Sequence, residues 1–376
     1  MRTVGREIKR ILGSRWTVFF FLIMPPLLTV YFGLLFQQGV IEHARLVVVD
    51  QDQSNLSRSL VDQFADNKGF DLVGAVEDLD TAVEMVDREQ VDAVVAVPPG
   101  FSRDLKKGKS PSVLFVADAS NMAISSNAVK RAGEIILTFQ AGIEIKTLES
   151  KGLPPDEAQN TALPLQYVYQ QVGNPSGSFY DFLLWGLIGA VAHFPILVFS
   201  AASWGGEAKE PDFPGIAAKI AAYSFLGMGE VLFCLLLAIL LFPLVFYGSY
   251  GALLLLVACF VVALTTLGTF LSLALPSPIV ASQCAVIVAL PALLLSGHTW
   301  PMSGFPWFVK MLGRIEPLTY FADPLRELAL TGRTGALYRQ GIEVLLLMSA
   351  ICIMGIFFAC TIRKKVHTWK SQAFSG

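Results

Sequence analysis

Four ionisable residues interrupt otherwise apolar sequence and are the first candidates for chemistry: His193, Glu230, His298 and Glu316. Histidine and carboxylate side chains serve as general acids and bases, but catalysis also needs a nucleophile and an orienting group within reach. No recognisable spacing of a nucleophile, a base and an orienting group surrounds these four residues. A hydrolase or transferase built around them is therefore not favoured, and we expect no catalytic residues.

A phosphate-binding loop is suggested only superficially, by Gly108-Lys109-Ser110. In that motif the first glycine would stand at position 103, which is Arg103, so this segment is not expected to bind a nucleotide. The five cysteines all fall in apolar runs, without the spacing of a disulfide framework or a metal site. We expect this chain to bind no metal ion and no cofactor of its own.

The longest uncharged stretch covers residues 231–309, which contain no Asp, Glu, Lys or Arg. One bilayer crossing needs about 20 apolar residues in a helix, and this stretch is long enough for about three crossings with their turns. The chain as a whole has 54% hydrophobic and only 15% charged residues. These features indicate an α-helical polytopic membrane protein.

Apolar segments separated by turn and proline signals predict six transmembrane helices. Pro25-Pro26 lies inside the first segment, which is longer than a signal-peptide core and lacks a convincing cleavage site, so a retained and kinked span is expected. Pro276 and Pro278 separate the fourth span from the fifth, because proline lacks the amide donor of a helix. The predicted spans cover residues 17–37, 182–206, 215–247, 251–275, 279–296 and 344–362.

Basic residues at both ends of the chain predict the orientation of these spans. Five basic residues precede Trp16, and Arg363-Lys364-Lys365 follow the last span. Both termini are therefore expected in the cytoplasm of a bacterium, with the chain in its inner membrane and the long region after the first span outside. The basic residues between 298 and 341 disagree with this orientation, because it would place them outside the cytoplasm. We interpret them as anchors of interfacial helices.

The region between the first and second spans has the composition of a soluble domain. Residues 42–181 contain 21 acidic and 12 basic residues, which argues against a nucleic-acid surface. A long helical pattern near 122–150 follows shorter helical patterns that alternate with strands. The strand-like apolar runs lie at 45–50, 70–76, 91–97 and 113–117. This alternation predicts a small mixed α/β domain, extracytoplasmic in the orientation above.

Two ionisable residues fall inside predicted spans, His193 in the second and Glu230 in the third. An acid at the bilayer centre costs at least about 2.5 kcal/mol, so such groups normally face protein or water. The two spans run in opposite directions, and helical rise places both residues at a similar depth. We therefore hypothesise that His193 and Glu230 approach each other, either as a structural hydrogen bond or as part of a polar path.

A segment rich in glycine, proline and aromatic residues follows the fifth predicted span. It contains Ser296-Gly297-His298-Thr299-Trp300-Pro301, Phe305-Pro306-Trp307, Glu316-Pro317-Leu318-Thr319-Tyr320 and Arg326. This succession resembles the signature region of type-2 ABC exporter permeases. The order of one span, a large domain and five further spans is similar to the branch of that family with an extracytoplasmic domain. The resemblance covers nearly the whole chain.

The resemblance implies roles for two groups of residues. The 204–219 loop occupies the place of the loop that couples the permease to its ATPase, through Glu207, Lys209, Glu210 and Pro211. The family pattern has Gly-Thr after an acidic pair, whereas here Pro211 follows Glu210, so an ordinary polar turn stays as the alternative. The broken segment after the fifth span would form an outer gate, with Gly297, His298, Pro301, Pro306, Pro317 and Arg326.

The predicted fold is an α-helical polytopic membrane protein with six transmembrane helices and a mixed α/β extracytoplasmic domain. The chain would begin with a cytoplasmic amphipathic segment and the first transmembrane helix, followed by the α/β domain. A five-helix transmembrane region with an outer re-entrant segment, 298–330, and a cytoplasmic tail would complete it. The corresponding boundaries are 1–16, 17–37, 38–178, 179–362 and 363–376.

The function implied by the resemblance is that of the permease subunit of an ABC exporter. It would pair with itself or with a homologous permease, contact membrane lipids, and draw energy from a separate ATPase that binds ATP and Mg. A periplasmic adaptor is a further expected partner, and nucleic acid is not. A hydrophobic or amphiphilic substrate is favoured because the spans offer few polar groups. The alternatives are a mechanotransmission subunit and a membrane-anchored sensor, both acting through the external domain.

Overall fold

The computed structural model describes residues 2–36, 43–120, 122–165, 173–174, 178–204 and 212–373. The chain divides into two compact units, which are described separately. The helical unit comprises Met1–Gly39 and Gln170–Gly376, and the sheet unit comprises Val40–Tyr169. The predicted α/β domain at 38–178 encloses the sheet unit.

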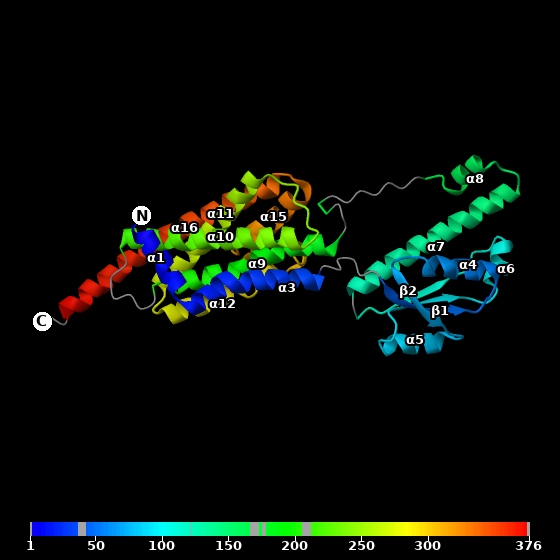
Figure 1. Ribbon diagram of the computed structural model, residues 1–376, viewed down its shortest axis with the longest axis horizontal. Coiled ribbons are helices and arrows are strands. Elements are labelled where there is room, and N and C mark those ends of the chain that lie inside the picture. The colour runs from blue at the N-terminus through cyan, green and yellow to red at the C-terminus, as the bar shows by residue number, and fades with distance from the viewer. Residues whose placement is uncertain are drawn as a thin grey trace. The chain divides into compact units, whose positions relative to one another are not determined.

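The helical unit contains a bundle of long apolar helices (Figure 1). Within the described residues five helices are long and apolar enough to cross a membrane, at Arg15–Phe36, Tyr180–Ala201, Phe213–Leu241, Tyr250–Ala274 and Ala336–Ile362. The elements of this unit are α1 (Arg2–Gly13), α2 (Arg15–Val18), a π-helical turn (Phe19–Ile23), α3 (Met24–Phe36), α9 (Phe179–Ala201), α10 (Phe213–Leu241), α11 (Tyr250–Ala274), α12 (Pro278–Ala289), α13 (Ala292–Leu295), a 3-10 turn (Met302–Gly304), α14 (Trp307–Arg314), α15 (Thr319–Thr331) and α16 (Ala336–Ala373).

Prolines decide two features of these helices. In the first span, Pro25 and Pro26 lie at the start of α3, directly after the π-helical turn. In that turn the Met24 amide donates to the Phe19 carbonyl five residues earlier. A wider turn of this kind accommodates carbonyls whose usual donors are missing. The predicted fifth span, 279–296, is not one long helix, because Pro291 ends α12 and a separate short helix, α13, follows it. It therefore does not count among the five long apolar helices.

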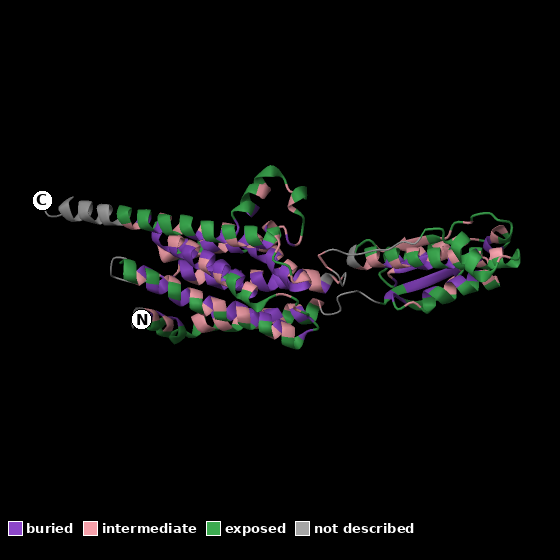
Figure 2. Cartoon of the chain, turned by 90° about the horizontal axis from the view of Figure 1, so that it is seen from above, coloured by how far each residue is buried: buried purple, intermediate pink, exposed green. Residues whose placement is uncertain are grey.

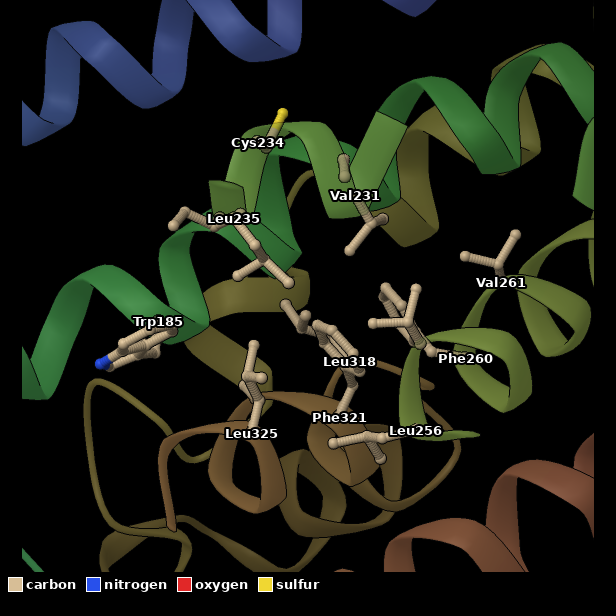
Figure 3. Packing of buried hydrophobic residues seen from close by; sticks show 14 of the residues in the cluster. Trp185, Val231, Cys234, Leu235, Leu256, Phe260, Val261, Leu318, Phe321 and Leu325 are labelled. Atoms are coloured by element: carbon tan, nitrogen blue, oxygen red, sulfur yellow. The ribbon is translucent and has the colours of Figure 1, made fainter. Parts of the chain in front are cut away.

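The core of the helical unit is a cluster of aliphatic and aromatic side chains from α9, α10, α11 and α15. Figure 3 shows Trp185, Val231, Leu256 and Phe321 within this cluster. The rings of Phe260 and Phe321 stack with centroids 4.0 Å apart and an interplanar angle of 10°. Buried side chains gather on the facing sides of the helices, whereas the exposed ones lie on their outer sides (Figure 2). The cluster joins α15 firmly to the long helices.

The backbones of α9 and α11 approach closely at Gly268. A Cβ atom at this position would lie 2.8 Å from the Leu197 carbonyl oxygen and 3.0 Å from the Ala201 nitrogen. It would also lie 2.5 Å from the Ser200 Cβ atom. Only glycine leaves enough space for this approach, since side-chain rotation moves none of these three atoms away.

The sheet unit is built around a four-stranded sheet with the strand order β2-β1-β3-β4. Strands β1, β2 and β3 are parallel, and β4 is antiparallel to β3. The strands β1 (Ala44–Asp50), β2 (Phe70–Ala75), β3 (Ala93–Val97) and β4 (Leu114–Ala117) occupy the four positions expected from the apolar runs. The helices are α4 (Asn55–Ala65), α5 (Leu79–Asp87), α6 (Phe101–Lys106), α7 (Met122–Ser150) and α8 (Pro155–Ala162). The short helices α6 and α8 were not expected from the sequence.

Helices cover both faces of the central strands (Figure 1). Leu46 and Val48 of β1 pack in the cluster that contains residues of α4 and α7, whereas Val47 and Val49 pack in the cluster that contains residues of α5. Consecutive strand residues point to opposite faces, so a strand covered on both sides reads as one continuous apolar run. This explains the uninterrupted Leu-Val-Val-Val sequence.

Arg45 and Asp92 form a bidentate ion pair beside strands β1 and β3. Arg45 Nη2 lies 2.8 Å from Asp92 Oδ1, and Arg45 Nε lies 3.1 Å from Oδ2. The Arg45 main-chain amide also donates to Oδ2 at 2.7 Å. These donors lower the pKa of Asp92 from its ordinary value, chiefly through the side-chain hydrogen bond from Arg45.

Replacing Asp92 by asparagine should therefore lower the free energy of unfolding of the sheet unit by about 1 kcal/mol at pH 7. The effect should be no larger, because the Arg45 side chain is half exposed and solvent screens the ion pair. Because the folded-state pKa of Asp92 is lowered, this contribution is present above its unfolded pKa, about 3.9, and is lost as the pH falls through the folded-state value. In the intact protein, the β1 and β3 amides of Asp92→Asn should exchange their hydrogens faster at pH 7 than those of the unsubstituted protein. Equal protection of Asp92→Asn and the unsubstituted protein at pH 7 would contradict the prediction.

Candidate functional site

The predicted coupling residues Glu207, Lys209, Glu210 and Pro211 lie outside the described residues. The structure describes the chain up to Trp204 and again from Asp212. At the start of α10, the Asp212 side chain accepts a hydrogen bond from the Gly215 amide and caps the helix. The described residues therefore flank the predicted loop on both sides.

A buried lysine connects the two sides. Lys219 on α10 is only 1% exposed, and its Nζ donates to the Ser203 carbonyl at 2.6 Å. The same Nζ lies 3.7 Å from Glu7 Oε2 of α1 and 4.5 Å from the centre of the Trp204 ring. We call Glu7, Arg10, Ser203, Trp204 and Lys219 the N-terminal clasp.

Arg10 completes the clasp from α1. Its guanidinium donates to the Ser203 carbonyl at 3.0 Å and lies 3.2 Å from Glu7 Oε2. Two cations thus meet a carbonyl that follows the C-terminal end of α9, where the helix dipole favours positive charge. Ile11 of α1 is buried in the core of the helical unit, so charge and apolar contacts both hold the amphipathic helix in place.

The segment between α13 and α15 forms a second polar region. Gly297 has φ +83°, a left-handed conformation that turns the chain directly after Ser296. Pro306 precedes the first residue of α14, and Pro317 lies in the turn between α14 and α15. The prolines therefore divide this segment into short elements, as expected from their missing amide donors. Pro324 is different, because it lies inside α15.

Four of the six predicted gate residues line one pocket of about 520 Å³. They are Gly297, His298, Pro301 and Arg326. Pro306 and Pro317 do not line it. Arg314 of α14 and Asp323 of α15 also line this pocket. We call this cavity the polar pocket.

His298 is held from two sides at the wall of the polar pocket. Its Nδ1 lies 2.9 Å from Asp323 Oδ1, and its Nε2 lies 3.3 Å from the Leu183 carbonyl oxygen of α9. The imidazole stacks on Phe182 with centroids 5.3 Å apart. It also fills the space beside Gly186, where a Cβ atom would collide with the ring.

Arg326 is fixed in the same assembly. Its guanidinium lies 3.2 Å from Asp323 Oδ1 and 4.3 Å from the centre of the Phe182 ring. The carboxylate of Asp323 therefore accepts from His298 and Arg326 together, while Phe182 contacts both of these side chains. The arrangement can orient a cationic group toward a ligand.

The hypothesised hydrogen bond between His193 and Glu230 is not formed, and neither ring nitrogen of His193 has a hydrogen-bond partner among the described residues. His193 Nε2 lies 3.4 Å from Glu316 Oε1, and both side chains are buried. Both carboxylate oxygens of Glu230 are buried on α10 without a hydrogen-bond partner among the described residues. Whether two residues meet depends on the face that each helix turns toward its neighbours, and a similar depth in the helices is not sufficient.

The family of the chain follows from comparison with known families. Residues 15–210 match the ABC-2 family transporter protein family, and residues 212–330 match the ABC-2 type transporter family. The first match alone covers more than half of the chain. The chain belongs to the ABC-2 transporter family. This ABC-2 protein is therefore a permease, the membrane part of a transporter.

Individual relatives of the ABC-2 protein agree with this assignment. It is 20% identical to the probable multidrug ABC transporter permease YbhR of Escherichia coli K12, over 82% of this chain and 84% of YbhR. It is 26% identical to the probable multidrug permease YbhS of the same organism, over 39% of each chain. The match to YbhS thus spans well under half of that relative. ABC transporter G family member 20 of Dictyostelium discoideum is 25% identical over 60% of this chain and 32% of its own length.

Several residues of these sites were not singled out from the sequence. Glu7 and Lys219 were missed as a pair, although Lys219, the one basic residue of the mostly apolar α10, was a detectable signal. Asp323 was also missed, although it lies three residues before the predicted gate residue Arg326, on one face of a helix. Nothing in the sequence points to the contact between His298 and the Leu183 carbonyl.

Proposed function

We propose that this ABC-2 permease is the transmembrane subunit of an ABC exporter. It would move a hydrophobic or amphiphilic substrate out of the cytoplasm or the inner leaflet, using ATP hydrolysis by a separate subunit. That partner would bind ATP and Mg, and two permease subunits, identical or homologous, would surround the path. The few polar side chains on the long helices favour such a substrate.

The observation that carries this proposal is the N-terminal clasp. Lys219 joins the carbonyl of Ser203 to Glu7 of α1, and these residues flank the predicted coupling loop. A push on Glu207, Lys209, Glu210 or Pro211 by the ATPase would then move the end of α9, the start of α10 and α1 together. Rigid-body movement of packed helices is a common way to switch a transporter between states.

The proposed arrangement places both termini and the clasp in the cytoplasm of a bacterium, with the chain in the inner membrane. The broken pair α12 and α13 would make the fifth crossing, giving six in all. The sheet unit would then lie outside the cytoplasm, where a periplasmic adaptor could bind it. The segment with Gly297, His298, Pro301, Pro306, Pro317 and Arg326 would form the outer gate.

The proposal is tested by purifying the full chain from its native membrane, identifying the ABC ATPase that co-purifies with it, and reconstituting the complex in vesicles. We expect a stable complex whose ATP hydrolysis rises with an amphiphilic substrate. Charge reversal of Glu207 and Glu210 together should reduce this stimulation, whereas reversal of the exposed Glu149 on α7 should not. An ATPase that neither associates with the permease nor responds to it would overturn the proposal.

A further inference from the structure

The polar pocket carries more positive than negative charge. The guanidinium groups of Arg314 and Arg326 line it, together with the imidazole of His298, against a single lining carboxylate, that of Asp323. Two guanidinium groups and one carboxylate leave an excess positive charge even when the imidazole is neutral. The phenol of Tyr320, which also lines the pocket, adds no negative charge in its usual protonated form. A concave site with this balance attracts an anion.

The carboxylate of Asp323 already contacts two partners, whereas the guanidinium of Arg314 has no ion-pair partner among the described residues. Asp323 Oδ1 lies 2.9 Å from His298 Nδ1 and 3.2 Å from an Arg326 nitrogen. Arg314, the last residue of α14, is exposed and forms no ion pair with any residue that the structure describes. Guanidinium groups bind phosphate and carboxylate through paired donors, so Arg314 is suited to an added anion.

A second guanidinium lines the pocket in addition to that of Arg314. Arg326 is meanwhile held in position by Asp323 and the Phe182 ring. The pocket thus offers one fixed cation and one free cation.

Apolar surface adjoins the charged lining. Helix α14, which ends at Arg314, exposes Trp307 and most of the large apolar side chains that follow it. These exposed side chains are Trp307, Phe308, Met311, Leu312 and, just after the helix, Ile315. A small inorganic anion would gain nothing from this surface, whereas an attached hydrocarbon chain would be removed from water along it.

We propose that the polar pocket binds the anionic headgroup of an amphiphile, a phosphate or carboxylate whose apolar chain lies along α14. Arg314 and Arg326 contact the headgroup. This assignment also gives Arg314 and Arg326 a role in a segment that the orientation predicted from the two termini would place outside the cytoplasm. As a statement about the exported substrate it rests on the proposed function, whereas the binding itself needs no ATPase.

The test measures equilibrium binding to the full-length permease alone, in nanodiscs of neutral phosphatidylcholine. The three probes are dodecyl phosphate, dodecanol and inorganic phosphate, which separate the headgroup from the chain. We expect saturable binding of dodecyl phosphate that weakens as salt is raised, and much weaker binding of the other two. Arg314→Gln should reduce the affinity for dodecyl phosphate about tenfold, and Arg314→Lys should reduce it less.

Arg333→Gln is the matched control, because Arg333 is exposed on the same part of the chain and does not line the pocket. Its affinity for dodecyl phosphate should equal that of the unsubstituted permease. Equal binding of dodecanol, or an unchanged affinity in Arg314→Gln, would overturn the site. Equal binding of inorganic phosphate would overturn the amphiphile assignment. Failure of the export proposal would instead appear in the ATPase complex and leave these affinities unchanged.

Discussion

Gly268→Ala is expected to destabilise the helical unit by about 3 kcal/mol, the upper part of the usual range for overpacking. The added Cβ atom would lie 2.8 Å from the Leu197 carbonyl oxygen and 3.0 Å from the Ala201 nitrogen. Because these are main-chain atoms, α9 and α11 must separate to relieve the contact. The separation weakens the packing of the buried side chains between them. Unfolding of the purified protein in mixed micelles, followed by circular dichroism, measures the free-energy change.

Gly229→Ala provides the control for this prediction. Gly229 lies in α10, and a Cβ atom there would meet nothing within 4 Å. Alanine favours the helical conformation over glycine by roughly 0.5–1 kcal/mol, so this variant should be as stable as the unsubstituted protein or slightly more stable. If Gly268→Ala unfolds with the same free energy as Gly229→Ala, the close approach of α9 and α11 is not a constraint.

Lys219→Met is expected to release α1 from the helical unit. Removing one partner of a buried ion pair costs about 3–5 kcal/mol, and the cost should lie at the lower end because Glu7 keeps its contact with Arg10. The Ser203 carbonyl keeps only the Arg10 hydrogen bond. Faster proteolysis within residues 2–13 and a lower free energy of unfolding should follow. Within the proposed exporter, stimulation of the ATPase should also fall.

A double variant separates the ion pair from general packing. Glu7→Gln combined with Lys219→Met removes both charges, so it should be less destabilised than the sum of the two single variants. Lys9→Met is the control, since Lys9 is exposed on the same helix and forms no ion pair with a described residue. Strictly additive effects of Glu7→Gln and Lys219→Met would show that Glu7 and Lys219 do not interact.

The polar sites show where prediction from the sequence ends. His193 and Glu230 share a similar depth in their helices, and this led to their expected pairing. The structure instead brings Glu316, from a turn far along the chain, to 3.4 Å from His193. Depth follows from the rise per residue, but a contact also depends on the rotation of each helix about its axis. In apolar helices this rotation is weakly marked, because almost every face is hydrophobic.

The membrane class of this protein, its long spans and the alternation of strands and helices between the first two spans were all predictable from the residues alone. These features are local: the length of an apolar run, a missing proline amide and the period of a strand are read from neighbouring residues. Only the tertiary structure decided that Lys219 meets Glu7, that Arg314 and Arg326 line one pocket, and that Pro291 divides the fifth span. The first two of these features depend on the packing of residues that lie far apart in the sequence. The break at Pro291 depends on whether the surroundings tolerate a proline kink, which a single sequence does not state.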